Sequence, residues 1–421
     1  MVGIRMLHFS VLPSAPYCVL AAFMLSLCEP TEPDMLKRFL SSLTTVLLPA
    51  ALFAQQNIGQ KTEAVLSPEV NPDCTVTFRL YAPKAHKVAV IGDWENGVAP
   101  LTEGEGGVWE YTTAPLPSEL YTYRFYVDGL IGLDPGNPFT LRDVGTTFSY
   151  FYVGGDKASY YQVQDVPHGS VEQLWYHSGA TGKDRRLSVY LPAAYDGKKK
   201  FPVLYLLHGS GGDETAWLEL GKTARIMDNL IARGEAVPMI VVMPNGNIGA
   251  QAAPGETPAN LAFRPVMSNQ IPSNYKNGTY EASFGEIVSF IDGRYKTVRN
   301  RQSRAVAGLS MGGFHSLYIS LNHPDLFSWT GLFSAGLVPQ FTSDLDVYSS
   351  REAKLKAYEK KGCNLFWIAI GKEDFLYEVN KDFRGELDSI GFPYEYHESS
   401  RGHLWCNWRQ YMLLFVPKLF K

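Results

Sequence analysis

The sequence predicts an α/β protein in which an all-β sandwich precedes a mostly parallel, doubly wound sheet. Three observations predict this fold class. Short segments with alternating apolar and polar residues fill the first part of the chain. From about residue 165, continuous apolar runs of strand length alternate with segments of helical periodicity, as in a parallel sheet that helices cover on both faces. Glycine and proline punctuate both parts.

The all-β unit is expected over residues 60–155. Glycine, proline and aspartate separate its short strands, which is typical of a sandwich. Trp109 lies within a strand and is expected in the core, whereas Trp94 lies in a loop and is the better candidate for exposure. Residues 155–169 are interpreted as a linker. The predicted strands are Cys74–Tyr81, Lys87–Ile91, Val108–Thr112, Tyr121–Val127 and Thr147–Val153.

The second unit is expected over residues 165–421. It begins with outer strands within residues 171–191, and a helix is predicted over Ser283–Tyr295. Residues 245–280 are long and rich in Gly, Pro and Asn, and we interpret them as a lid or substrate wall, with a surface excursion as the alternative. The predicted inner strands are Val203–Leu207, Met239–Met243, Ala305–Ala307, Asn364–Gly371 and Tyr394–His397.

The most informative segment reads Gly308-Leu309-Ser310-Met311-Gly312. An apolar strand enters it and a helical pattern leaves it, which is typical of a sharp strand-to-helix turn that exposes a serine hydroxyl. Glycines on both sides of the serine let the strand and the helix approach closely. Ser310 is therefore the candidate nucleophile. The alternative is a tight turn with a solvated serine.

A nucleophilic serine needs a base to take its proton and an acid to orient that base. Asp374 follows the predicted strand that ends at Gly371, where a doubly wound sheet places functional groups. His403 lies in the loop after the next predicted strand. The order serine, aspartate, histidine is the one that α/β-hydrolases use, which makes Asp374 the acid and His403 the general base. Glu373 and His397 are the neighbouring competitors.

The oxyanion that forms during attack needs hydrogen-bond donors. The predicted strand Val203–Leu207 runs into His208-Gly-Ser-Gly-Gly212, a loop whose amides can face a developing negative charge without side chains in the way. We assign the two donors to the backbone N–H groups of Ser210 and Met311. A phosphate cradle is the alternative, but no Gly-Lys-Ser/Thr sequence ends the loop.

Four blocks stand out as a set, namely His208–Trp217, Ala307–Gly313, Ile370–Phe375 and Gly402–Trp405. They resemble the esterase D and enterochelin-esterase-like superfamily and, more narrowly, the feruloyl and acetylxylan carbohydrate esterases. The resemblance implies an α/β-hydrolase fold and hydrolysis of feruloyl or acetyl esters on plant xylan. It also implies a triad of Ser310, Asp374 and His403, with the amides of Ser210 and Met311 as oxyanion donors.

Several aromatic residues lie in or just after these blocks and could line an acyl pocket, with ordinary packing as the alternative for each. These residues are Trp217, Phe375, Tyr377, Trp405 and Trp408. Arg401 departs from the pattern of the superfamily, in which many members have a second glycine before the histidine.

The front unit carries the blocks Gly92–Trp94, Gly107–Glu110, Tyr126–Gly129 and Leu133–Pro138. They resemble immunoglobulin-like early-set modules related to glycogen-binding modules. The resemblance implies that this unit contacts glycan or caps the active site. The alternative is that its alternating aromatic residues fill a sandwich core.

Charge and composition exclude some function classes. The chain has 38 Lys and Arg against 42 Asp and Glu, a formal net charge of −4, so nucleic-acid binding is not predicted. No Cys and His cluster has zinc spacing, and a serine triad needs no metal, so neither metal nor cofactor is predicted. The expected partner is an esterified plant polysaccharide or oligosaccharide, and no stable membrane partner is expected.

The amino-terminal segment, residues 1–54, is interpreted as an upstream extension followed by a signal peptide. Met35–Phe39 supplies a positive start and Phe39–Phe53 an apolar core, with a cut after Ala54. Export to the medium or the periplasm is therefore expected. The alternatives are a membrane anchor at Val19–Leu27 and a lipid on Cys28.

Removal of this segment would leave Cys74, Cys363 and Cys406. They are expected to be free thiols, with a bridge between the last two as the open alternative.

The sequence leaves three functions open: a secreted carbohydrate esterase, a siderophore-type esterase, and a non-catalytic glycan-binding protein.

Overall fold

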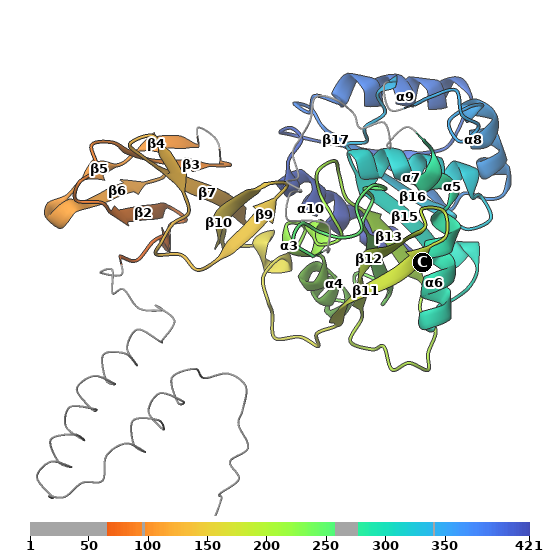
Figure 1. The fold of residues 1–421 in the computed structure, drawn as a ribbon, viewed down its shortest axis with the longest axis horizontal. Helices are drawn as coiled ribbons and strands as arrows, with labels where there is room; N and C mark the ends of the chain where they lie inside the picture. Colours follow the sequence, from red (N-terminus) through yellow and green to blue (C-terminus); the bar gives the residue numbers. More distant parts are fainter. Residues whose placement is uncertain (1–64, 95–96, 257–276, 340–341) are drawn as a thin grey trace, which may run out of the picture. The chain divides into compact units, whose positions relative to one another are not determined.

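The computed structural model describes residues 65–94, 97–256, 277–339 and 342–421. Val65–Lys421 form one compact unit (Figure 1). The predicted signal segment and both anchor alternatives lie outside the described residues, as does most of the predicted lid. In the described ranges, no helix is both long and apolar enough to cross a bilayer.

The front module is an immunoglobulin-like sandwich of two antiparallel sheets. The first has the order β1-β2-β6-β5, and the second has the order β4-β3-β7-β10-β9 with β8 paired to β7. The five predicted strands are all present, with ends shifted by two residues at most. The strands are β1 (Glu69–Val70), β2 (Val76–Tyr81), β3 (Val88–Gly92), β4 (Val98–Pro100), β5 (Thr102–Glu103), β6 (Val108–Thr112), β7 (Glu119–Val127), β8 (Leu130–Gly132), β9 (Thr140–Asp143) and β10 (Thr146–Val153).

Trp94 and Trp109, whose exposure was predicted from the sequence, are both buried in the module. Trp109 is 8% exposed, as predicted, and its indole N–H donates to the carbonyl of Ala82 at 3.1 Å. The expected exposure of Trp94 is wrong, because its side chain is 7% exposed and stacks on Phe78 at 5.3 Å. The ring folds back over Gly92, where a Cβ atom would lie 1.8 Å from it. The position of Trp94 in a loop therefore did not decide its exposure.

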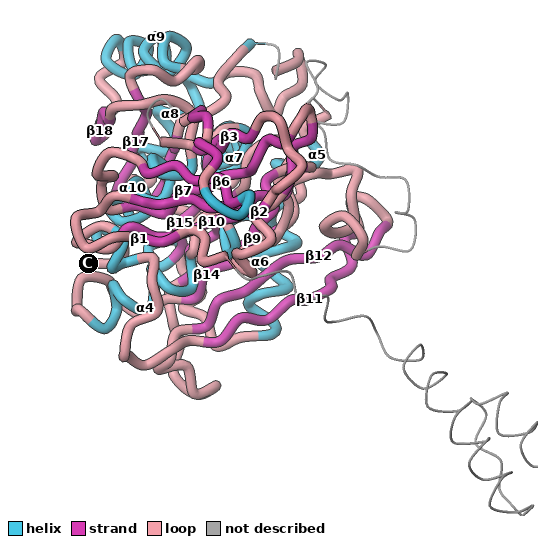
Figure 2. Tube along the Cα trace, turned by 90° about the vertical axis from the view of Figure 1, so that its left-hand side faces the viewer, coloured by secondary structure: helices cyan, strands magenta, loops and turns pink. Residues whose placement is uncertain are grey.

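The second part of the unit contains an eight-stranded sheet with the order β11-β12-β14-β13-β15-β16-β17-β18. The first two strands form the long hairpin seen in Figure 2, and β12 pairs antiparallel with β14. All later pairings are parallel, as predicted. The strands are β11 (Ser170–Ser178), β12 (Lys183–Leu191), β13 (Val203–Leu207), β14 (Ile240–Pro244), β15 (Arg304–Leu309), β16 (Trp329–Phe333), β17 (Leu365–Gly371) and β18 (Glu395–Ser399).

Helices cover both faces of this sheet because its strands are apolar on both sides (Figure 1). Leu204 and Leu206 pack with α3 (Ala216–Glu219), α4 (Thr223–Ala232) and α10 (Trp405–Phe415) on one face. Val203 and Tyr205 point to the other face, where α6 (Phe284–Arg294) packs. The same face carries α7 (Met311–Asn322), α8 (Arg351–Lys360) and α9 (Tyr377–Ser389). Strand β16, which was not predicted, lies fully buried between β15 and β17.

The module and the α/β part share one hydrophobic core. Leu120 of β7 and Leu141 of β9 belong to the same apolar cluster as Leu204 and Trp408 of the α/β part. Residues 155–169, interpreted as a linker, contain the short helix η2 (Ala158–Tyr160) and the fully buried Tyr161, which belongs to that cluster too. This segment is therefore part of the contact between the two parts and not a free spacer.

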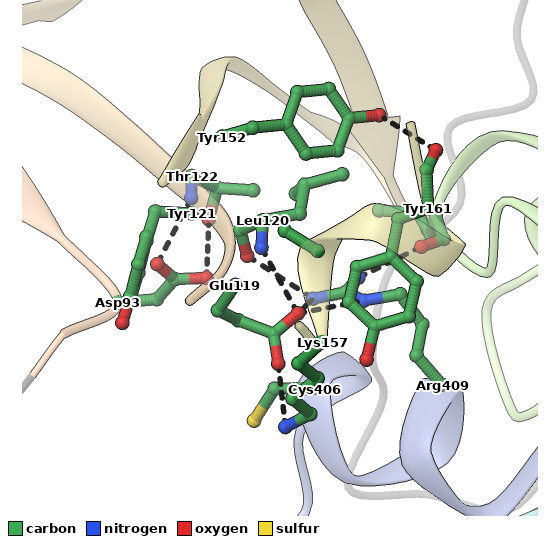
Figure 3. Close-up of polar contacts among 12 residues, drawn as sticks. Asp93, Glu119, Leu120, Tyr121, Thr122, Tyr152, Lys157, Tyr161, Cys406 and Arg409 are labelled. Carbon is green, nitrogen blue, oxygen red and sulfur yellow. Dashed lines mark hydrogen bonds and ion pairs between the residues drawn. The ribbon is translucent and has the colours of Figure 1, made fainter. Parts of the chain in front are cut away.

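A buried ion pair crosses the same contact (Figure 3). Arg409 of α10 donates to Glu119 of β7 through both Nε, at 3.2 Å, and Nη2, at 3.0 Å. Lys157 lies 2.7 Å from the other carboxylate oxygen. Arg409 also donates to the carbonyls of Leu120 and Leu220, so its buried guanidinium is well supplied with acceptors. The module and helix α10 are thus joined by charge as well as by apolar packing.

We expect Glu119→Gln to destabilise the protein by about 3–5 kcal/mol, because the change leaves the buried Arg409 without its counter-charge. Urea unfolding followed by fluorescence would measure the loss. Glu352→Gln is the matched control, since Glu352 pairs with Lys356 on an exposed helix face, where such a pair contributes about 0.5 kcal/mol or less. Equal stabilities for the two variants would contradict the structural role of the buried pair.

Candidate active site

Ser310 lies at the turn between β15 and α7 in a strained backbone conformation. Its φ of 53° and ψ of −115° are unusual for a residue with a side chain. The Ser310 amide donates to the carbonyl of Phe333 at 2.9 Å, and the Ser310 carbonyl accepts from the amide of Gly336 at 2.8 Å. These bonds to the segment of β16 and the loop after it hold the turn in place.

The glycines around Ser310 are required by close backbone approach. A Cβ atom at Gly308 would lie 2.5 Å from the backbone of Gly312, and one at Gly312 would lie 2.3 Å from the carbonyl oxygen of Leu207. Gly209 would place a Cβ atom 2.5 Å from Leu309 and 3.3 Å from the Cβ atom of Ser310. The loop after β13 therefore runs directly against the turn that carries the serine.

The structure places Asp374 against His403. The imidazole Nδ1 lies 2.9 Å from one carboxylate oxygen of Asp374 and 3.1 Å from the other. The Asp374 side chain is fully buried, and one of its oxygens also accepts from the amide of Leu376. The competitors lie elsewhere: Glu373 is exposed, and His397 stacks on Trp367 within β18.

Ser310 and His403 line one cavity of about 190 Å³, together with Ser210. Within the part of the chain that the structure describes, no hydrogen bond joins the Ser310 hydroxyl to the imidazole. Contacts of this kind often tighten only when a substrate is bound. Ser310 and His403 thus face the same space, and Asp374 contacts His403 without lining the cavity.

The loop after β13 is held by His208. The carbonyl of Gly209 lies 2.8 Å from Nδ1 of this histidine, and the amide of Gly246 donates to its Nε2 at 2.8 Å. This pair of contacts requires a neutral ring with its proton on Nδ1. Burial is the main cause that lowers the pKa of His208 to about 4. Among the described residues, the amides of Ser210 and Met311 have no acceptor. Ser210 lines the cavity, whereas Met311 is 2% exposed and is not one of the lining residues.

Of the aromatic residues predicted to bind substrate, some line the cavity and others do not. Trp405 lines the cavity, as does Trp408, whose ring meets His403 edge-on at 4.8 Å. The assignment of Trp217 to the pocket wall is wrong, because it is 1% exposed and donates to the carbonyl of Leu207. It packs edge-on against Trp405 at 5.3 Å and supports the wall from behind.

Phe375 and Tyr377 lie outside the cavity lining. Phe375 is 74% exposed, and its ring centroid lies 4.6 Å from that of His403. The hydroxyl of Tyr377 donates to Glu398 at 2.7 Å. Hydrogen bonds from Tyr377 and Tyr396 lower the pKa of Glu398 to about 2. The structure thus gives Tyr377 a partner at the surface in place of the predicted contact with substrate.

The cavity also contains residues that the sequence did not single out. Arg142, Asp143 and Val144 of the front module line it, next to Asp213 and Thr215. The resemblance to glycogen-binding-type modules suggested a cap over the active site but no particular residue. No local signal links residue 143 to residue 310, because their proximity arises only from packing of the module on the α/β part.

The three described cysteines are free, so the bridge considered between Cys363 and Cys406 is not formed. Burial raises the pKa of both thiols, that of Cys363 to about 11. Over the described ranges, no group of three His, Cys, Asp or Glu side chains has the arrangement of a metal site.

Comparison with known proteins identifies the family. The family described as Putative esterase matches residues 178–418, which is more than half of the chain. The chain belongs to this esterase family. Residues 65–138 of the esterase match the family described as Carbohydrate-binding module 48 (Isoamylase N-terminal domain).

Two curated relatives and one solved structure are similar to this esterase. The endo-1,4-beta-xylanase/feruloyl esterase of Xylanibacter ruminicola is 31% identical over 84% of this chain and 46% of its own length. Endo-1,4-beta-xylanase Y of Acetivibrio thermocellus is 29% identical over 36% of this chain and 13% of its own length. The chain therefore spans less than half the length of these relatives. The enterobactin esterase FES from Shigella flexneri has a TM-score of 0.59 at 16% identity, over 82% of this chain and 93% of that one, and shares its fold.

We expect acid to destabilise the esterase through His208. The pKa of His208 is about 4 in the folded protein against 6.5 without burial, so the unfolded chain binds more protons between these values. Stability should therefore fall as pH drops from 6.5 to 4, with a contribution on the order of 3 kcal/mol from this residue.

Urea unfolding of the His208→Asn variant at pH 7, 6, 5 and 4 would check this expectation. The amide of asparagine does not titrate, so its stability should depend less on pH across this window than that of the parent. His177→Asn is the control, because the side chain of His177 is 67% exposed. Parallel pH profiles for the parent and the His208→Asn variant would contradict the expectation.

Proposed function

We propose that this protein is a serine esterase that hydrolyses carboxylic esters on a carbohydrate. Ser310 acts as the nucleophile, His403 as the general base and Asp374 as the acid that orients the base. The observation that carries the proposal is the shared cavity. The strained turn presents Ser310 to the space that His403 lines, and His403 is bound from behind by a buried carboxylate.

The proposed reaction has two steps. In the first step, His403 takes the proton of the Ser310 hydroxyl as its oxygen bonds to the ester carbonyl carbon. The amides of Ser210 and Met311 donate to the oxyanion, and the alcohol leaves with the proton from the imidazole. In the second step, water repeats the sequence on the acyl-enzyme and releases the acid. Asp374 stabilises the imidazolium and keeps Nε2 facing the serine.

We propose further that the acyl group is feruloyl or acetyl and that the alcohol belongs to a plant cell-wall polysaccharide such as xylan. Two curated relatives carry xylanase in their names, and one of them also carries feruloyl esterase. The match of the front module to a carbohydrate-binding family supports a glycan substrate. Trp405 and Trp408 offer an aromatic wall that suits an aromatic acyl group.

Export of the protein is proposed from the segment that begins at Met35, which has the composition of a signal peptide. A polymeric plant substrate would be met outside the cell, so the proposed export is consistent with the proposed substrate.

The likeness to an enterobactin esterase is one of fold alone and does not favour a siderophore substrate.

We expect Ser310→Ala to lower turnover of methyl ferulate and p-nitrophenyl acetate by roughly 10⁴-fold or more, because no acyl-enzyme can form. Initial rates, with thermal unfolding as a check on folding, would measure the loss. Ser289→Ala is the control, since that serine is exposed on α6. Near-parental turnover in Ser310→Ala would remove the serine from the mechanism.

We expect Asp374→Asn to lower kcat by about 10³- to 10⁴-fold, because the amide no longer stabilises the imidazolium or its correct tautomer. Glu373→Gln is a closely matched control, as it is the adjacent carboxylate but is exposed to solvent. Its kcat should stay within about twofold of the parent. If the two variants lost activity equally, the orienting role of Asp374 would be excluded.

A further inference from the structure

The turn between β9 and β10 brings a carboxylate of the front module to the catalytic cavity. Asp143 lines this cavity together with Ser310 and His403, which are far away in the sequence. The turn belongs to the module, whereas the proposed catalytic groups belong to the α/β part. The cavity is therefore built by both parts of the chain.

Arg142 fixes the turn to the loop that carries the proposed oxyanion donor. Its guanidinium lies 2.5 Å from the carboxylate of Asp213 and donates to the carbonyl of Val144 at 2.7 Å. Asp213 itself is buried and accepts from the amide and the hydroxyl of Thr215. Because Arg142 is engaged in these bonds, the turn is held in one place relative to Ser210.

Val144 adds a second anchor and a sign of strain. Its φ of 51° is a genuine outlier for a β-branched residue, and such outliers persist only where surrounding contacts impose them. A Cβ atom on Gly211 would lie 2.9 Å from a methyl group of Val144, so the β9–β10 turn and the loop after β13 are in close contact. Strained residues of this kind cluster at ligand sites.

The residues that line the cavity differ in exposure, and the buried ones include the carboxylate of Asp213 as well as apolar side chains. Ala216, Leu220, Leu309 and Trp408 are each less than 9% exposed and form an apolar interior. Arg142, Asp143, Val144, Ser210, His403 and Trp405 are half-buried and form the rim. A cavity of about 190 Å³ cannot enclose a polysaccharide. The buried apolar side chains suit an acyl group, and the half-buried polar ones, which include Asp143, suit a sugar.

The chemistry of Asp143 suits a sugar. Burial raises the pKa of its carboxyl group, while Trp405 and Arg142 favour the charged form. Along the described ranges, no Lys, Arg or His lies within 4 Å of this carboxylate. An ionised carboxylate accepts hydrogen bonds and donates none, so it recognises hydroxyl donors.

We propose that Asp143 determines specificity on the alcohol side of the ester by accepting hydrogen bonds from hydroxyl groups of the leaving sugar. This inference rests on the proposed ester hydrolysis and names a binding group for its substrate. The residue acts on recognition and takes no proton from Ser310, since His403 holds that role. It gives the front module a direct part in the choice of substrate.

The test compares Asp143→Asn with the parent on two esters of the same acid, methyl ferulate and feruloylated arabinose. We expect the variant to lose about 10- to 100-fold in kcat/KM on the sugar ester, mainly through KM, because a hydrogen bond to a charged group is lost. Turnover of methyl ferulate should stay within about twofold, since methanol has no further hydroxyl group. Asp156→Asn, a change at an exposed aspartate just after the module, should alter the turnover of neither ester.

Three kinetic outcomes would overturn the proposal. Equal losses on both esters would mean a structural role, and no loss on the sugar ester would mean no contact with the sugar. Methyl cinnamate lacks the phenolic hydroxyl group of methyl ferulate and therefore tests for contact with the acyl group. If Asp143→Asn abolishes a preference for methyl ferulate over methyl cinnamate, the carboxylate binds the acyl group instead of the sugar.

A binding measurement separates this proposal from the proposed hydrolysis. Calorimetry with the Ser310→Ala protein, with and without Asp143→Asn, measures affinity for feruloylated arabinose without turnover. We expect weaker binding of the sugar ester when Asp143 is changed and unaltered binding of methyl ferulate. Such a result in a protein whose parent cleaves neither ester would refute the hydrolysis but keep the sugar contact. Unaltered binding of the sugar ester would refute the contact.

Discussion

The closeness of three backbone segments around Ser310 is the constraint on which the site depends. Strand β15, the start of α7 and the loop after β13 approach so closely that Gly308, Gly312 and Gly209 have no room for a Cβ atom. This close contact surrounds Ser310, whose backbone is held in a strained conformation. The parallel sheet makes the approach possible, because the carboxyl ends of β13 and β15 lie side by side.

The front module is part of this assembly and is not an appendage. Its strands contribute Leu120 and Leu141 to the core of the α/β part, and Glu119 forms a buried ion pair with Arg409. Helix α10, which carries Arg409, begins two residues after His403. The module is therefore a neighbour of the loop that carries His403 and a wall of the cavity, so that the stability of the fold and the shape of the cavity depend on the same interface.

Burial separates the roles of the aromatic residues near the site. Trp217 and Trp405 meet edge-on, yet only Trp405 lines the cavity. Trp217 is buried behind it, and its indole N–H donates to the backbone carbonyl of Leu207 in β13. Phe375 lies beside His403 but remains largely exposed. The same holds in the module, where Trp94 lies in the loop after β3 but its side chain packs into the sandwich core. Nearness in the sequence to a catalytic motif thus did not determine contact with the cavity.

The sequence by itself determined the fold class, most of the strands, and the choice of Ser310, Asp374 and His403 as candidate site residues. It could do so because apolar periodicity and the glycines of a sharp turn are local properties of the chain. Asp374 and Glu373 follow the same predicted strand, and only their burial in the structure separates them. Only the tertiary structure decided that Trp94 and Trp217 are buried, that residues 155–169 pack between the two parts, and that Asp143 lines the cavity. Each of these results from packing between segments distant in the chain, and no local pattern records which surfaces will meet.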